Sequence, residues 1–238
     1  MAFSRGPKIV TDGLVLYLDA VNTNSYPGSG NTWSDLSSNG NDGTLVNGPQ
    51  FNSDNLGSID FDGVNDNISI GNLSNNIPKT EGTLSAWVSP IGYESTQIYR
   101  IMNINVEGST HGHGFDFSLY TNNRFLSVIN AGSNRIFAYT PGLDNNFINS
   151  GIPKNLAYIW NETNQNWFIN GESIGVGSNS FTENITPIDY SSETLQIGIR
   201  GSGGPFKGLI PQVSIYNKAL SAEEILQNYN ATKSRYGL

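Results

Sequence analysis

The amino-acid sequence predicts an all-β protein, a sandwich of two antiparallel sheets, with one short helix near the C-terminus. Short segments in which apolar and polar residues alternate recur along the chain, separated by Gly, Asn and Asp. Such alternation is typical of strands that turn one face to a core and the other to solvent. A helix-capping pattern stands out near the C-terminus. Many short strands with one late helix favour a β-sandwich or jelly roll.

The predicted strands follow one another in a regular way. A turn of sequence GVND separates two of them, and the turn Thr121–Arg124 leads into another, Phe125–Val128. Leu14, Leu16 and Leu18 form the first apolar face, and later faces are formed by Ile59 and Phe61, Ile68 and Ile70, Leu84, Ala86 and Val88, and Phe115, Phe117 and Leu119.

Two local patterns predict a hairpin and a helix. Asn170-Gly171 lies between two apolar runs, and type I′ turns favour Asn-Gly because both central residues need a positive φ. Ser221 and Glu224 match the S-x-x-E capping box, and an apolar stripe follows at Ile225, Leu226 and Tyr229. The positive charges of Lys233 and Arg235 are favourable near the C-terminal, negative end of the helix dipole, and Gly237 can terminate the helix. We expect this helix at about residues 221–234.

Composition and charge exclude several classes of protein. The formal net charge is −8, and the sequence contains no run of Lys or Arg that would form a local basic patch. An acidic surface of this kind disfavours nucleic acid and anionic membranes as partners. The apolar run GLVLYLDA is far shorter than the roughly 20 residues that cross a bilayer. The first residues carry no apolar signal region, so we expect synthesis in the cytoplasm without a signal peptide. With no cysteine there are no disulfides. Residues 1–12 are predicted to form an arm outside the core, and residues 13–238 a single domain.

Several stretches resemble a known family. They are LVLYLDAVNTNSYPGSGNTWSDLSSNGNDGTL (Leu14–Leu45), GSIDFDGVNDNISI (Gly57–Ile70) with GTLSAWV (Gly82–Val88), AYIWNETNQNWFINGESIG (Ala157–Gly175), and FKGLIPQVSIYNKALSAEEILQNYN (Phe206–Asn230). Together they resemble the laminin-G-like jelly roll of the concanavalin A-like lectin/glucanase superfamily. The first stretch, Leu14–Leu45, is similar to the versions of this jelly roll that occur in virion proteins of tailed, notably marine, bacteriophages. The resemblance implies two curved antiparallel sheets. It leaves function open, because this fold hosts lectins, glycosidases and adhesion modules.

The sequence favours a protein that is not an enzyme. Glucanases of the superfamily carry several carboxylates on one strand face, at the spacing that a retaining mechanism needs. Here the close acid pair of that geometry is Asp60 and Asp62, and we interpret it as turn chemistry before Gly63. No G-x-S-x-G motif is present, and the only histidines are His111 and His113. In HGHGFD these two histidines, with Asp116, suit a metal site, a glycan-contacting loop or a plain Gly-rich loop.

The stretch DLSSNGNDG (Asp35–Gly43) begins like an EF-hand calcium loop, but Val46 stands where the anchoring Glu belongs. We expect a turn in which Asp35, Ser37, Asn39 and Asn41 bind nearby N–H groups, and in which Gly40 and Gly43 take a positive φ. The family resemblance implies a structural calcium near the last long strand, but this chain reads IPQV there. No cofactor is required. The candidate calcium ligands are Asp19, Asp35, Asp62 and Asp66.

Sugar recognition combines a flat aromatic ring with amide or carboxylate groups. Several aromatics lie in Gly-, Asn- and Ser-rich settings, and Phe206 is expected to be the most exposed of them. The alternative is that each one plugs an end of the sandwich. Trp87, Trp160 and Trp167 are predicted core residues. The candidate carbohydrate-binding residues are Trp33, Tyr93, His111, His113, Tyr139 and Phe206, with Tyr26 in a similar setting.

Two functions remain after these exclusions. The first is a non-catalytic, lectin-like module displayed on a phage virion, with glycans of the host cell surface as partners. The second is a structural virion protein, a capsid decoration or tail appendage, that uses the jelly roll to bind other virion proteins or copies of itself.

Overall fold

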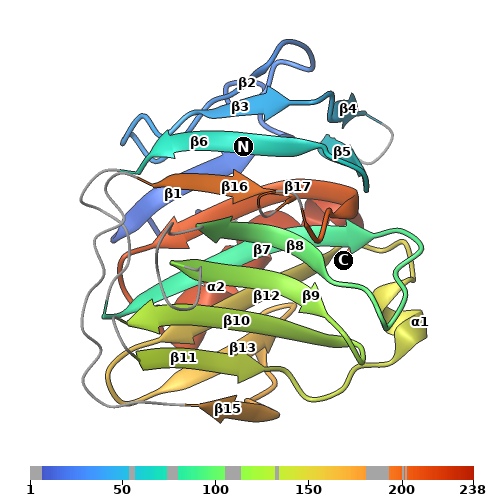
Figure 1. Ribbon diagram of the computed structural model, residues 1–238. Helices are drawn as coiled ribbons and strands as arrows, with labels where there is room; N and C mark the ends of the chain where they lie inside the picture. Colours follow the sequence, from blue (N-terminus) through green and yellow to red (C-terminus); the bar gives the residue numbers. More distant parts are fainter. Residues whose placement is uncertain are drawn as a thin grey trace.

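Two antiparallel sheets pack face to face in the computed structural model, which describes residues 7–53, 57–73, 80–104, 114–131, 134–180, 193–199, 201 and 203–238 (Figure 1). In the described part of the chain, sheet A has eight strands. Their order is β14 (Glu172–Ser173), β13 (Gln165–Ile169), β12 (Lys154–Trp160), β7 (Gly82–Pro90), β17 (Lys207–Tyr216), β5 (Ser58–Asp62) and β4 (Gln50–Asn52), and β1 (Leu14–Asp19) pairs with β17.

Sheet B has nine strands in the described ranges. Their order is β15 (Ser178–Ser180), β11 (Asn134–Tyr139), β10 (Arg124–Ala131), β9 (Phe115–Tyr120), β8 (Tyr99–Ile104), β16 (Thr194–Ile197), β6 (Asn67–Asn72), β3 (Gly43–Val46) and β2 (Thr32–Trp33). Two antiparallel sheets with one late helix confirm the predicted fold class.

The core lies between the sheets and is rich in aromatic rings. Trp167 of sheet A stacks on Phe117 of sheet B at 5.3 Å between ring centroids. Trp160 and Trp167 belong to this core, as predicted. The Asn170-Gly171 turn between β13 and β14 has φ values of 53° and 80°, which confirms the predicted hairpin.

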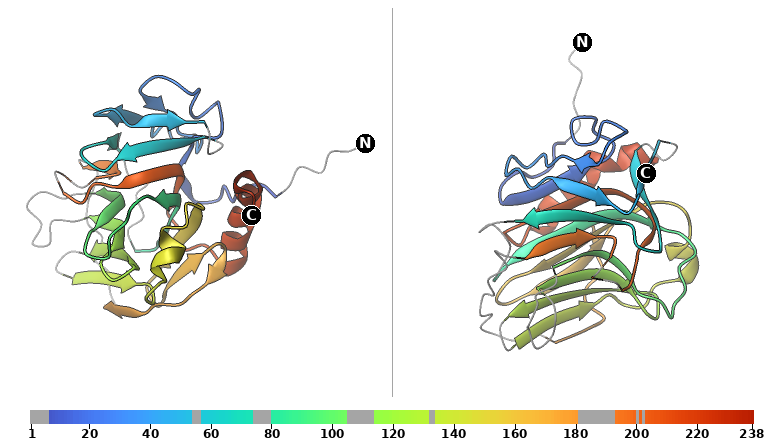
Figure 2. Two further views of the ribbon diagram at one scale, coloured as in Figure 1. Left: turned by 90° about the vertical axis from the view of Figure 1, so that its right-hand side faces the viewer. Right: turned by 45° about the horizontal axis from the view of Figure 1, so that its top comes forward.

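The helix α2 (Ala222–Thr232) lies on the outer face of sheet A, as the end-on view in Figure 2 shows. A 3₁₀ turn, Lys233–Tyr236, continues it and ends at Gly237 with φ 71°. Trp87 is fully buried as predicted, but beneath this helix rather than between the sheets. Its Nε1 donates to Thr232 Oγ1 at 3.0 Å, and its ring stacks on Tyr229. A second helix, α1 (Asn145–Ile148), was not predicted, because four residues capped by Asp144 carry no periodic pattern.

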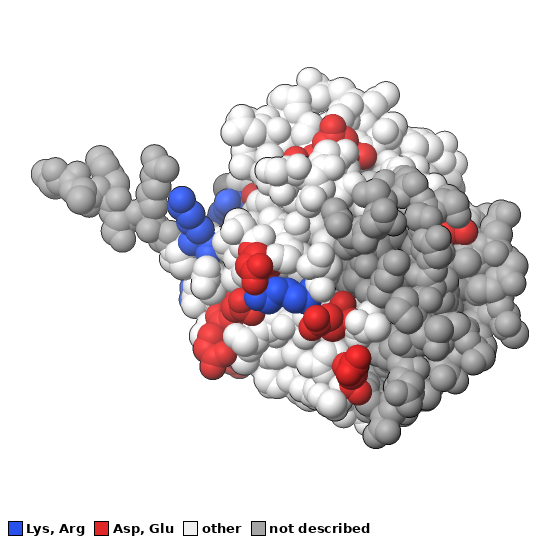
Figure 3. All heavy atoms as spheres, turned by 90° about the vertical axis from the view of Figure 1, so that its left-hand side faces the viewer, with Lys and Arg blue, Asp and Glu red and all other residues white. Residues whose placement is uncertain are grey.

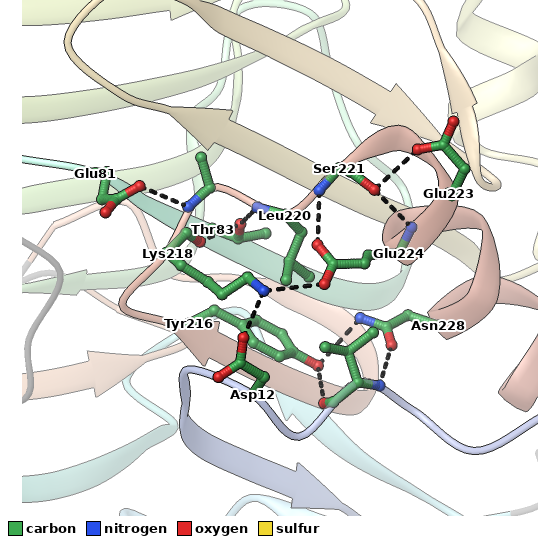
Figure 4. Close-up of polar contacts among 12 residues, drawn as sticks. Asp12, Glu81, Thr83, Tyr216, Lys218, Leu220, Ser221, Glu223, Glu224 and Asn228 are labelled. Carbon is green, nitrogen blue, oxygen red and sulfur yellow. Dashed lines mark hydrogen bonds and ion pairs between the residues drawn. The ribbon is translucent and has the colours of Figure 1, made fainter.

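Polar contacts fix the start of α2 (Figure 4). Ser221 and Glu224 bind each other's backbone N–H groups, which confirms the predicted capping box. Lys218 Nζ bridges Asp12 and Glu224 at 2.7 and 2.9 Å.

The segment before β1 is attached to the same helix. Val10 N–H donates to Asn228 Oδ1 at 2.8 Å, and Tyr216 Oη donates to the Val10 carbonyl at 3.1 Å. Val10 is buried in a small cluster with Tyr216 and Ile225. The prediction that residues 1–12 lie outside the core is therefore wrong for Val10, because the short apolar pair Ile9-Val10 is too brief to form a periodic pattern. No helix in the described ranges is long and apolar enough to span a bilayer.

Candidate functional site

Three aromatics that the sequence offered as sugar-contacting residues are buried. Trp33 and Phe206 are 0% exposed and Tyr93 is 3% exposed. Phe206 N–H bonds to the Gly198 carbonyl at 2.6 Å, which draws the Gly-rich segment back so that the ring lies edge-on against Phe61. The prediction that Phe206 is exposed is wrong. These rings, and Tyr26 at 3%, plug the sandwich instead and offer no face to a sugar.

Tyr139 differs because it is half-buried on the outer face of sheet B. Its ring lies 5.5 Å from Tyr120 and 5.7 Å from Phe137, and the Arg124 guanidinium carbon lies 4.6 Å from its centroid. A sugar-contacting role for Tyr139 stays a prediction. His111 and His113 lie outside the described residues.

The loop Asp35–Asp42 covers the open edge of β1. Asp35 Oδ1 accepts from the backbone N–H groups of Tyr17 and Ser37, and Oδ2 accepts from that of Asn41. The side chains of Ser37, Asn39 and Asn41 all donate to the Val15 carbonyl. This loop satisfies backbone groups that would otherwise invite pairing with another strand.

The expected turn is thus confirmed for Asp35, and for Gly40 with φ 74°. It is also confirmed for Ser37, whose Oγ accepts from Asn39 N–H as well as donating to the Val15 carbonyl. It is wrong in detail for Asn39 and Asn41, whose side-chain amides donate to carbonyl groups of β1. It is also wrong for Gly43, which does not have a positive φ. Gly43 is needed because a Cβ there would lie 2.5 Å from Ile68 Cγ2.

Replacing Asp35 tests this loop. We expect Asp35→Ala to lower the free energy of unfolding by about 2 kcal/mol, because it leaves several N–H groups of the loop and of β1 without an acceptor. Urea denaturation measures the loss. Asp42→Ala is the control, since Asp42 is exposed and accepts from Asp35 N–H, and should cost about 1 kcal/mol or less. Equal losses in the two variants would contradict this role for Asp35.

The candidate calcium ligands are not brought together as one set. Asp19 is 0% exposed, and its Oδ2 accepts from Arg235 Nη1 and Tyr17 Oη. Gln212 stands opposite Asp19 in the β1–β17 register, so the partner strand supplies an amide there. A guanidinium thus supplies the positive charge expected of calcium at Asp19.

The other acids shape turns. Asp35 holds the loop described above, and Asp62 and Asp66 hold the turn between β5 and β6 through Val64 N–H and Asp62 N–H. Burial, and then the negative charges of Asp62 and Asp60, raise the pKa of Asp66, although its bond from Asp62 N–H acts the other way. Within the described ranges, no three His, Asp or Glu residues gather so as to hold a metal ion.

A polar cleft lies at one end of the sandwich, where the β7–β8 and β16–β17 loops meet. Two adjoining depressions, of about 380 and 260 Å³, share Gln97, Ile98 and Pro205 in their walls. We call them together the loop-end cleft. Their other polar lining comes from Thr96 and Arg100 in one, and from Glu94, Tyr99 and Lys207 in the other.

Buried aromatics and backbone bonds support the cleft from below. The Tyr93 ring lies 5.4 Å from Tyr99, which in turn lies 5.9 Å from Phe206. Tyr93 Oη donates to the Tyr120 carbonyl, and Asn149 binds both backbone groups of Tyr93. The rings that sequence placed in the binding surface therefore lie beneath it and hold the loops in place.

Charges of both signs border the cleft. The Arg100 guanidinium forms an ion pair with Asp116, whose side chain is 1% exposed. Glu94 and Lys207 are exposed. Burial, and then the negative charge of Glu94, raise the pKa of Tyr99, so its hydroxyl stays protonated and donates to the Gly92 carbonyl at 3.3 Å.

Sequence reasoning missed Gln97, Glu94, Arg100 and Lys207. They come from segments far apart in the chain, and nothing in their local sequence marks them. The Gly-rich run before Phe206 was the available signal, and it correctly indicated a loop.

Comparisons with known proteins agree with this architecture. No curated protein sequence matches the chain. Solved structures that match share its fold at low identity. They include the binding domain of Paraclostridial Mosquitocidal Protein 1 (TM-score 0.69, 20% identity, 93% of this chain and 52% of that one). The ligand-binding domain of botulinum neurotoxin serotype D, in complex with N-acetylneuraminic acid, matches with TM-score 0.69 at 17% identity over 92% of this chain and 51% of that one.

A structure of botulinum neurotoxin type C also matches, with TM-score 0.72 at 16% identity over 93% of this chain and 52% of that one. Its description states that cell entry of this toxin depends on interaction with two ganglioside molecules. The chain thus spans about half the length of these structures. The family model described as the concanavalin A-like lectin/glucanases superfamily matches residues 62–226. The chain therefore belongs to the concanavalin A-like lectin/glucanases superfamily.

Proposed function

We propose that this protein is a non-catalytic carbohydrate-binding module and that its loop-end cleft binds the glycan. The observation that carries the proposal is the pair of adjoining depressions that share Gln97, Ile98 and Pro205. Binding sites for small ligands are concave and place a few polar groups on a rigid support. Here the support is the layer of buried rings at Tyr93, Tyr99 and Phe206.

The lining groups suit sugar hydroxyls. The Gln97 amide both donates and accepts, Glu94 accepts, and Lys207 donates. Ile98 and Pro205 offer apolar surface to the C–H groups of a sugar ring. Charged hydrogen-bonding groups strengthen such contacts, each by about 1.5–3 kcal/mol.

The lining also argues against glycoside hydrolysis. A retaining mechanism needs two carboxyl groups about 5 Å apart, and an inverting one needs two that are somewhat farther apart. Glu94 is the sole carboxylate among the described residues that line the cleft. Asp60 and Asp62 lie on β5, where Asp62 holds a turn.

The comparisons support the proposal at the level of the fold. The structures cited above belong to toxin domains whose names mention N-acetylneuraminic acid or gangliosides. Those ligands belong to whole domains, of which this chain matches about half.

Location on a tailed-phage particle, with host surface glycans as ligands, is the finer part of the proposal. It rests on the resemblance of Leu14–Leu45 to phage virion proteins. An antibody raised against the chain should label purified particles from the phage that encodes it. Particles that carry none of the protein would remove this part and leave the glycan-binding part standing.

Paired variants test the cleft. We expect Gln97→Ala and Glu94→Gln each to weaken binding of an array-positive glycan by about tenfold, the equivalent of about 1.4 kcal/mol. Isothermal titration calorimetry measures the affinity. Asn146→Ala is the matched control, since Asn146 is an exposed amide on α1 outside the cleft. Unchanged affinity in both cleft variants, with a glycan that binds the wild type, would place the site elsewhere.

A further inference from the structure

Two side chains of opposite charge line the smaller depression of the loop-end cleft, which has a volume of about 260 Å³. Glu94 belongs to the wall formed by the β7–β8 loop and Lys207 to the wall formed by the start of β17, and both side chains are exposed. Neither forms an ion pair with another residue in the described ranges. A carboxylate and an ammonium group are therefore both open to a ligand in this one depression.

The stem of Lys207 lies against the turn that follows β5. Gly63 stands at this turn with φ 80°, and a Cβ there would lie 2.8 Å from Lys207 Cβ and 3.0 Å from its Cγ. Only a residue without a side chain lets the lysine stem pass so closely. Asp62 stands opposite Lys207 in the β5–β17 register, but its Oδ1 accepts from Val64 N–H, and the two side chains do not form an ion pair. The ammonium group of Lys207 is thus placed at the cleft and available there.

A hydrogen-bonded turn places Glu94 and Gln97 on the facing wall. Gln97 N–H donates to the Glu94 carbonyl at 2.9 Å. Asn122 N–H donates to the Ser95 carbonyl at 2.8 Å, which joins this turn to the turn between β9 and β10. Since backbone bonds fix the wall before a ligand arrives, little ordering of the loop has to accompany binding.

Charges of both signs in one depression disfavour ligands that carry a net charge. A carboxylate that binds Lys207 is repelled by Glu94, and an ammonium that binds Glu94 is repelled by Lys207. In the adjoining depression, Asp116 already compensates the guanidinium of Arg100. The whole chain has a formal net charge of −8, and Figure 3 shows Asp and Glu side chains gathered on the end of the sandwich opposite to the cleft. The field of the molecule thus repels anions, and a neutral ligand with a strong dipole is favoured.

An acetamido group combines the features that this depression matches. Its secondary amide is planar and carries an N–H donor and a carbonyl acceptor on opposite sides. A carboxylate accepts from such an N–H and an ammonium donates to such a carbonyl, and hydrogen bonds with one charged partner are stronger than those between neutral groups. Ile98 and Pro205, which are half-buried in the same walls, offer apolar surface to the methyl group.

We propose that the smaller depression of the loop-end cleft selects sugars that carry an acetamido group, with Glu94 accepting from the amide N–H and Lys207 donating to the amide carbonyl. This inference rests on the proposed glycan-binding function and adds the class of sugar that the cleft prefers. Sugars that carry only hydroxyl groups bind more weakly, because they leave the apolar surface of Ile98 and Pro205 uncovered.

Titration of the full chain followed by NMR tests this preference. The probes are the methyl glycosides of glucose and galactose, of the corresponding free amino sugars and of the corresponding N-acetylated amino sugars. We expect the N-acetylated member of at least one series to bind about tenfold more tightly than its parent sugar. The free amino sugar should bind less tightly than the N-acetylated one, because it brings a positive charge next to Lys207.

Variants of the two charged residues assign the preference to this depression. Lys207→Met removes the donor and should abolish most of the tenfold preference, and Glu94→Gln keeps an acceptor without its charge and should reduce it in part. Lys8→Met is the matched control, since Lys8 is exposed beside α2, where its carbonyl accepts from Gln227, and should leave the preference unchanged. The preference is a ratio of two affinities measured on the same variant, so a loss of folded protein does not alter it.

Three results would overturn the inference. The first is equal binding of the parent and N-acetylated sugars by the wild type, and the second is tighter binding of the free amino sugars, which would show that the cleft recognises a cation. The third is a preference that persists in both Lys207→Met and Glu94→Gln, since the acetamido group would then be bound elsewhere. Failure of the proposed function would differ from all three, because no glycan would bind the chain at all.

Discussion

The free energy of unfolding should fall steeply as the pH rises above 10. Tyr17, Tyr158 and Tyr216 are at most 7% exposed, and burial raises the pKa of each phenol well above the ordinary value of 10.0. Each hydroxyl also donates to an oxygen: Asp19 Oδ2, Gln165 Oε1 and the Val10 carbonyl, respectively. A phenolate in these places would face an acceptor, so ionisation requires unfolding.

The direction of the effect follows from proton binding. Between pH 10 and the raised pKa values, the folded state keeps phenol protons that the unfolded state releases, so stability falls as pH rises. Each such tyrosine lowers the free energy of unfolding by about 1.4 kcal/mol per pH unit, and these three together lower it by about 4 kcal/mol per pH unit. Burial lowers the pKa of Lys154, and this shift makes stability rise with pH instead of fall. It is a single group, and its effect is confined to pH values below the ordinary lysine pKa of 10.5. A typical domain stability of about 5–15 kcal/mol would be lost within a few pH units.

Urea denaturation at a series of pH values measures this slope, and absorbance of tyrosinate reports when the phenols ionise. Tyr158→Phe should reduce the slope by about 1.4 kcal/mol per pH unit, because it removes one of the phenols whose pKa is raised, a group that also includes Tyr236. Tyr120→Phe is the control, since Tyr120 is only half-buried. Release of all phenol protons near pH 10 from a chain that stays folded would refute the prediction.

Loss of Arg235 should destabilise the protein by about 3 kcal/mol. Its guanidinium reaches back from the C-terminal 3₁₀ turn to Asp19, whose carboxylate is completely buried in the first strand. Removing one member of a buried ion pair is costly because it leaves the other charge without compensation. Arg235→Ala followed by urea denaturation measures the effect.

Lys233→Ala is the matched control. Lys233 lies on the same turn and is half-buried, and its Nζ lies 5.2 Å from the Tyr229 ring centroid, a contact worth about 1 kcal/mol. Adding Asp19→Asn to Arg235→Ala should recover part of the loss, because the two side chains interact directly. A loss in Arg235→Ala no larger than in Lys233→Ala would show that Asp19 does not depend on this cation.

Local patterns were enough to predict much of the fold. Alternation marked the strands around Leu16, Phe61 and Phe117, Asn170-Gly171 marked the hairpin, and Ser221 with Glu224 marked the helix start. Each of these signals is set by neighbours within a few residues. Trp87 was correctly expected to be buried, but the helix that covers it arrives from more than a hundred residues away.

The candidate sites could not be predicted in the same way. The loop-end cleft depends on Gln97, Pro205 and Lys207 meeting in space, which no local pattern encodes. Composition suggested that Phe206 and Trp33 were exposed, because Gly and Asn are common in surface loops. Tertiary packing buried both rings, since each fills an end of the core that would otherwise be empty.

The measurement that tests the central claim most directly is a glycan array on the purified, folded chain, run with calcium and again with a chelator. Our account predicts binding to at least one glycan, retained in the chelator, because amide, carboxylate and ammonium groups line the cleft. Binding that disappears in the chelator would contradict this metal-independent recognition. No binding in either condition would contradict the lectin-like function itself and favour a structural role for the sandwich.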